Sequence, residues 1–90
     1  MRFEINAMPK TYKITRRAFL RRLNPVIREA LRASTDVIVI DIRESLMLET
    51  HQDLTDTSLK QSLIYLEYLG IMTYSEYEYV LNTPVTKNEV

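Results

Sequence analysis

The sequence contains no cysteine, only one glycine and no long uninterrupted run of apolar residues. Without cysteine the chain can form neither a disulfide nor a thiolate metal site. A single glycine excludes the glycine-rich loops that bind phosphates. No apolar run approaches about 18 residues, and the first residues lack the apolar region of a secretion signal. The sequence therefore predicts an intracellular, cytoplasmic protein that does not span a membrane.

The chain also has no net charge, but its charges are unevenly distributed. Residues 1–34 carry nine Lys and Arg against two Glu, which gives +7. Residues 35–90 carry three Lys and Arg against ten Asp and Glu, which gives −7. A division of this size within one small domain indicates charged partners. The alternatives are a nucleic acid on the basic part, head-to-tail association of copies, or two halves that neutralise each other.

The length of 90 residues and the apolar content of 46% are sufficient for one small folded domain. Residues 1–14 combine a short alternating segment with a stretch around Pro9, and we expect an N-terminal arm there. We expect the folded domain over residues 15–82. Residues 83–90 are predicted to form a polar C-terminal tail.

A helix that ends at a glycine is predicted in the second half of the chain. Its apolar residues recur every three or four positions and form one stripe: Leu59, Leu63, Leu66 and Leu69. Residues 55–58 are all types that cap helices, and Gly70 follows the last leucine, where positive φ ends a helix. We expect Leu59, Leu63 and Leu66 to be buried.

Two interpretations remain open for the residues after Gly70. Tyr77, Tyr79 and Leu81 alternate with other residues, which favours a hairpin of strands 71–74 and 77–81. Thr73 and Glu76 have the spacing of a capping box, which favours a short helix over 74–81 instead. The tyrosine alternation leads us to expect the hairpin.

The stretch from Thr55 to Leu81 resembles the recognition helix and wing of winged helix-turn-helix regulators of the MarR/ArsR type. The resemblance covers 27 residues and depends on a polar helix start, a leucine stripe, a Leu-Glu pair and a Leu-Gly-Ile step: residues 55–58, Leu63, Leu66-Glu67, Leu69-Gly70-Ile71 and 79–81. It implies a DNA-binding domain. This sequence departs from the family at Glu76 and Glu78, because family wings usually carry Arg or Lys there.

The first half of the chain completes the predicted order of elements. Residues 15–33 have helical periodicity across Pro25, so either one helix kinks there or Asn24 caps a second helix. Residues 36–42 are rich in β-branched side chains and predict a strand, followed by a short helix over 43–51. The order helix-strand-helix-helix-strand-strand predicts an α+β fold, a small winged helix with its helices packed on a short antiparallel sheet.

The resemblance implies sequence-specific binding of double-stranded DNA by a homodimeric transcriptional regulator. In that mode the helix after Thr55 enters the major groove, and the residues nearest the bases are Thr57, Ser58, Lys60 and Gln61. Arginines of the first helical segment share one arc and are expected to contact phosphates: Arg17, Arg21, Arg28 and Arg32. Alternatively, the polar residues after Thr55 and the four arginines are ordinary solvent-exposed faces of their helices.

Ile64, Tyr65 and Tyr68 lie opposite the leucine stripe and put large apolar groups on the outer face of the same helix. Such a surface favours burial against protein. We therefore expect an interface there, covered either by the basic helix of residues 15–33 or by a second subunit. The alternative function is a protein-interaction module that does not bind DNA.

Glu49, His51 and Asp53 are the only cluster suited to metal binding or acid–base chemistry. One histidine without a third ligand or a nucleophile is a weak signal, and a polar turn explains the cluster better. We expect no metal, no cofactor and no enzymatic activity.

Overall fold

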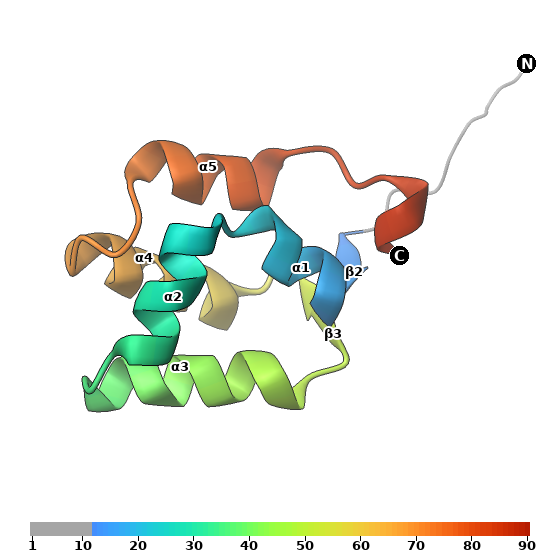
Figure 1. Ribbon diagram of the computed structural model, residues 1–90. Helices are drawn as coiled ribbons and strands as arrows, with labels where there is room; N and C mark the ends of the chain where they lie inside the picture. Colours follow the sequence, from blue (N-terminus) through green and yellow to red (C-terminus); the bar gives the residue numbers. More distant parts are fainter. Residues whose placement is uncertain (1–11) are drawn as a thin grey trace, which may run out of the picture.

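The computed structural model describes residues 12–90, and the predicted arm lies outside the described residues except for its last three positions. The elements within this range are two short strands, five α-helices and one 3₁₀-helix: β2 (Lys13–Thr15), α1 (Arg16–Arg22), α2 (Pro25–Ala33), α3 (Val37–Leu48), β3 (His51–Asp53), α4 (Thr57–Tyr68), α5 (Tyr74–Asn82) and η1 (Lys87–Glu89) (Figure 1). The fold mixes helices with an antiparallel sheet, but the order of elements differs from the predicted one.

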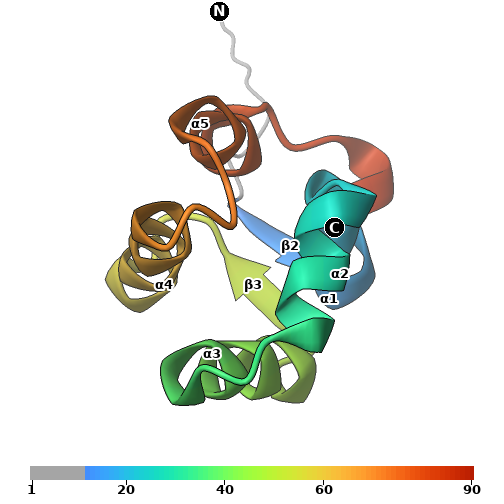
Figure 2. The ribbon, with the colours of Figure 1, turned by 60° about the vertical axis from the view of Figure 1, so that its left-hand side comes forward.

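A small two-stranded sheet lies beside α1 at one end of the helices (Figure 1), and it stands between α1 and α4 in the view of Figure 2. β2 and β3 pair antiparallel, with Ile14 opposite Gln52, and both of these side chains are buried. The sheet and the surrounding helices enclose one apolar core, in which Phe19, Leu63 and Val80 are completely buried. The predicted burial of Leu59, Leu63 and Leu66 is confirmed. Leu69, the last residue of the predicted stripe, is 39% exposed.

The chain forms two separate helices on either side of Asn24, so Asn24 caps a second helix and one kinked helix is excluded. The Asn24 side chain accepts a hydrogen bond from the backbone N–H of Ile27 at 2.9 Å, and Pro25 occupies the first helical position. Proline is favoured there because that position needs no backbone donor. The chain therefore changes direction between α1 and α2, which remain consecutive in the sequence.

The strand predicted over residues 36–42 is wrong, because this segment begins α3. The Asp36 carboxylate caps the helix by accepting from the N–H groups of Ile38 and Val39 at 2.8 and 3.1 Å. Val39, Ile42 and Leu46 are buried at helical spacing. β-branched residues favour strands only weakly, and a capped helix with a buried stripe overrides that preference.

The predicted hairpin over 71–81 is also wrong, because residues 74–82 form α5. Thr73 Oγ1 accepts from the N–H of Glu76 at 3.1 Å, and the Glu76 carboxylate accepts from the N–H of Thr73 at 2.8 Å. This capping box also lowers the pKa of Glu76. Gly70 ends α4 with a φ of 80°, as expected. The chain therefore has a helix in the place of the predicted wing.

The C-terminal residues contact α1 through Arg22, a buried arginine. Its guanidinium holds the Glu89 carboxylate with two hydrogen bonds of 2.8 Å. The same guanidinium donates to the carbonyl oxygens of Val80 at 2.9 Å and Thr83 at 2.8 Å. The polar tail predicted over 83–90 is thus joined to the domain by a guanidinium with most of its donors used.

Candidate nucleic-acid interface

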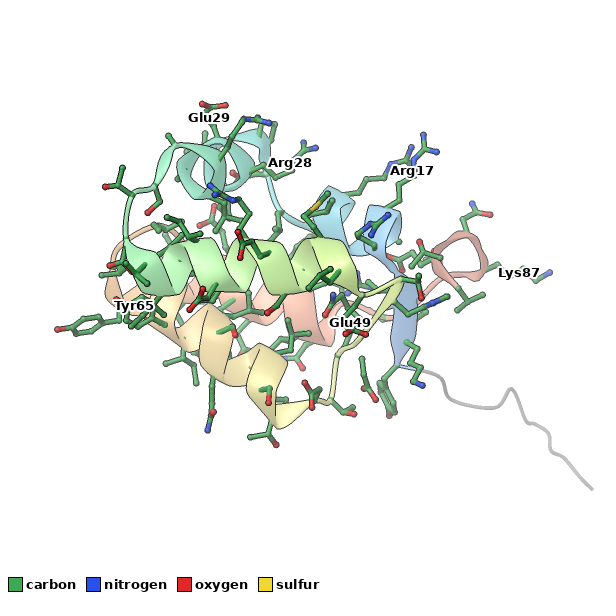
Figure 3. All side chains as sticks on the ribbon, turned by 90° about the horizontal axis from the view of Figure 1, so that it is seen from below. Arg17, Arg28, Glu29, Glu49, Tyr65 and Lys87 are labelled. Atoms are coloured by element: carbon green, nitrogen blue, oxygen red, sulfur yellow. The ribbon has the colours of Figure 1, made fainter. Side chains whose placement is uncertain are left out.

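Arginines from α1 and α2 line one surface depression of about 550 Å³, which we call the arginine hollow. Its charged lining consists of Arg16, Arg17, Arg21 and Arg28, and no described Asp or Glu lines it. Arg17 and Arg21 are one helical turn apart on α1, and Arg28 comes from α2 beyond the break at Pro25. Figure 3 shows Arg17 and Arg28 projecting from the same side of the molecule.

Three of these arginines have no protein partner within residues 12–90. Arg16 donates to the carbonyl oxygen of Met47 and so joins α1 to the end of α3. Arg17, Arg21 and Arg28 make no side-chain hydrogen bond or ion pair with another described residue, and all three are exposed. Guanidinium groups this close together repel one another, since their charges have the same sign. A bound anion would remove that repulsion, which makes the arginine hollow a candidate anion site.

Arg32, the fourth arginine predicted to contact phosphates, lies outside the lining of the arginine hollow. It pairs instead with Glu29 on its own helix, with a distance of 3.0 Å between Arg32 Nη2 and Glu29 Oε1. Both side chains are exposed, so the pair contributes little to stability. The structure therefore brings Arg17, Arg21 and Arg28 together and leaves Arg32 aside.

The polar residues predicted to read bases lie on the opposite side of the molecule from the arginine hollow. Thr57, Ser58, Lys60 and Gln61 are all exposed on the first two turns of α4. α4 lies behind α2 in Figure 1 and across the two-stranded sheet from α1 and α2 in Figure 2. The two predicted DNA-binding sets therefore lie on different elements, one on α4 and the other on α1 and α2.

The start of α4 faces acidic rather than basic surroundings. It borders a depression of about 860 Å³, whose lining includes Glu49, Asp53, Asp56 and Ser58 together with Lys13. Asp56 also caps α4 by accepting from the N–H of Leu59 at 3.2 Å. These carboxylates would repel a phosphate backbone.

The cluster of Glu49, His51 and Asp53 is part of the turn around β3. Thr55 donates to Asp53 Oδ1 from its hydroxyl at 2.6 Å and from its backbone N–H at 2.9 Å, which lowers the pKa of Asp53. His51 Nδ1 lies 3.2 Å from the hydroxyl of Thr50. Residues 12–90 hold no group of three His, Asp or Glu side chains placed to bind a metal ion. The two hydrogen bonds from Thr55 within this turn account for the position of the Asp53 carboxylate.

The predicted interface residues lie beside the first turn of α3. The Tyr65 hydroxyl donates to Asp36 Oδ2 at 3.1 Å, and this contact with burial raises the pKa of Tyr65. Tyr68 is 82% exposed, and its ring centroid lies 6.3 Å from that of Tyr65. Ile64 is half-exposed on the same helix. Val37 and Ile38, which directly follow Asp36, are also exposed and enlarge the surface.

A groove between α2 and α3 adjoins the arginine hollow, and the sequence did not predict it. We call it the apolar groove: it measures about 770 Å³, and its apolar lining includes Leu20, Pro25, Leu46 and Met47. Leu20 and Arg28 line both depressions, so the two are adjacent. The groove depends on how α3 packs against α2, and this packing cannot be read from the sequence.

No family model, curated protein or solved structure matches the chain. The resemblance to MarR/ArsR regulators therefore stays a prediction. Among residues 12–90, no helix is both long enough and apolar enough to cross a membrane.

Proposed function

We propose that the chain binds a polynucleotide by holding its phosphate backbone in the arginine hollow. The observation that carries the proposal is the gathering of Arg17, Arg21 and Arg28 around one depression with no described carboxylate in its lining. A guanidinium binds phosphate with two parallel hydrogen bonds, and several of them together suit a ligand with repeated charges. The acidic residues of α3 and α4 restrict the backbone to this side of the molecule.

The proposal is limited to backbone contacts. Thr57, Ser58, Lys60 and Gln61 have no part in this proposal, because α4 lies across the fold from α1 and α2. Reading of a specific duplex sequence and regulation of transcription follow only from the family resemblance. Backbone binding by itself gives affinity without sequence preference.

Salt dependence tests the proposal. Titration of labelled oligonucleotides at roughly 50 and 200 mM salt is expected to give a slope of about −2 to −3 in log K against log salt, from three neutralised phosphates. Polyglutamate of matched length is the control for a general preference for polyanions. Absence of oligonucleotide binding at the lower salt concentration, or equal affinity for polyglutamate, would overturn the proposal.

A second candidate function, association of two copies, is favoured by the exposure of apolar side chains on α3 and α4. Tyr68 and Val37 are 82% and 71% exposed, while Ile64 and Ile38 are about half-exposed. We propose that this surface pairs in a homodimer. Since it involves α4, pairing would leave the arginine hollows of both copies free. A different protein could occupy the surface instead, as the interaction-module alternative requires.

Light scattering at micromolar concentration is expected to give the mass of a dimer. Ile64→Lys with Tyr68→Lys should give a monomer, because two charges would be buried without partners. Val26→Lys on α2 is the control, since Val26 is 74% exposed outside this surface. A wild-type monomer throughout the micromolar range would contradict the homodimer.

A further inference from the structure

The apolar groove is a large depression that backbone binding leaves unused, and it adjoins the arginine hollow. Leu20 and Arg28 belong to both linings. Met47 is 52% exposed at the groove, although most methionines in a protein are buried. A volume of about 770 Å³ lies in the range of small-molecule sites. The groove is therefore accessible and large enough for a flat ligand.

The charged groups at the groove differ in what they can still bind. Arg43 donates to the carbonyl oxygens of Leu31 and Arg32, each at 3.0 Å, and so holds the end of α2 against α3. Arg32 pairs with Glu29. Arg28 has no side-chain partner among the described residues and stands where the groove meets the arginine hollow. An occupant thus meets apolar side chains in the groove and a free guanidinium at its end.

We infer that the apolar groove takes an unpaired base of the strand whose phosphates occupy the arginine hollow. The chain therefore prefers single-stranded nucleic acid to a duplex. This inference rests on the proposed function. In a duplex both faces of a base are covered by its neighbours, whereas a base of a single strand can leave the stack and contact protein. Arg28 can stack its guanidinium on the base, and the Met47 thioether makes favourable contacts with aromatic rings.

Oligonucleotides of equal charge separate base contacts from phosphate contacts. The probes are an oligothymidine of about 20 nucleotides, an abasic strand of the same length and a duplex of about 10 base pairs, which carries about the same number of phosphates, each followed by fluorescence anisotropy. Oligothymidine is expected to bind about tenfold more tightly than the abasic strand or the duplex, from one base held in the groove. Equal affinity for oligothymidine and the abasic strand would overturn the inference, while salt-dependent binding of both would leave the proposed function intact.

Two variants with the same charge change locate the base. Met47→Glu places a carboxylate at the groove, whereas Leu48→Glu places one at the next residue of α3, which is 80% exposed and does not line the groove. Met47→Glu is expected to weaken oligothymidine binding about tenfold and binding of the abasic strand at most about threefold, since only one base contact is lost. Leu48→Glu should change neither by more than about threefold. If the two variants weaken oligothymidine binding equally, the base does not bind in the groove.

An acidic amphipathic peptide is the competing occupant, because carboxylates could bind the arginines while apolar side chains fill the groove. A glutamate- and leucine-rich peptide serves as the probe in competition with oligothymidine. The inference expects weak competition. Displacement of oligothymidine at lower concentrations than unlabelled oligothymidine requires would assign the groove to a peptide. Failure of all oligonucleotides to bind would instead refute the proposed function itself.

Discussion

Replacing Arg17, Arg21 and Arg28 together by alanine is expected to weaken polynucleotide binding about 100-fold or more, since each charge-assisted contact contributes roughly 1.5–3 kcal/mol. The three side chains are exposed, so stability should change by no more than about 0.5 kcal/mol for each of them. The salt dependence should become nearly flat, because the phosphates that release counterions are no longer neutralised. Anisotropy titrations over a range of salt concentrations, with thermal unfolding as the check on stability, measure both effects.

Two control variants make this result specific. Arg32→Ala removes one charge from α2 outside the arginine hollow, and binding should weaken only about twofold. Lys60→Ala with Gln61→Ala removes the α4 residues suited to reading bases, and backbone binding should remain within about twofold of wild type. Loss of binding in the α4 variant but not in the arginine variant would show that the acidic half holds the working surface.

Arg22→Ala is expected to destabilise the fold by about 3–5 kcal/mol, because it leaves a partly buried carboxylate and several carbonyl oxygens without their donor. The Arg22 side chain is 3% exposed and that of Glu89 is 18% exposed. Arg21→Ala, one residue away on the exposed side of α1, should cost no more than about 0.5 kcal/mol. Urea unfolding measures both, and similar losses would show that the Arg22–Glu89 contact does not hold the C-terminal residues.

The same contact predicts a loss of stability in acid. The Arg22 guanidinium lowers the pKa of Glu89 from 4.5 to about 2. A lowered pKa in the folded state stabilises the fold above the unfolded pKa, and this contribution is lost as the pH falls from 4.5 through about 2. The contribution of the Glu89 carboxylate to the free energy of unfolding is about 2–3 kcal/mol. Glu89→Gln should be less stable at neutral pH and lose less stability on acidification. An unchanged acid dependence in Glu89→Gln would contradict the prediction.

The sequence was sufficient to predict a helix where the capping residue and the apolar stripe both indicated one. The leucine stripe of α4, its end at Gly70 and the cap at Asn24 could all be read from residue types and spacing. Where two local signals disagreed, the cap was the better guide. Asp36 caps α3 despite the β-branched run after it, and Thr73 with Glu76 starts α5 despite the alternating tyrosines. Tyr74 and Tyr77 stack at helical spacing, 5.9 Å apart.

Contacts between distant segments could not be read from the sequence. β2 and β3 are three residues each and mostly polar, and they pair at Ile14 and Gln52, which are 38 positions apart. Arg22 and Glu89 are 67 residues apart. The sequence predicts only an arc of arginines. It does not predict the arginine hollow, because the shape of the hollow depends on the angle between α1 and α2 and on the position of α3. The apolar groove depends on the same packing.

The central claim is that α1 and α2, and not α4, form the polynucleotide surface. Amide chemical-shift mapping tests it most directly: the labelled chain is titrated with oligothymidine, and the perturbed backbone N–H groups are assigned. The account predicts the largest changes between Arg16 and Arg28 and around Met47. Residues 57–68 should change little. Changes concentrated in residues 57–68, with residues 16–28 unperturbed, would contradict the account.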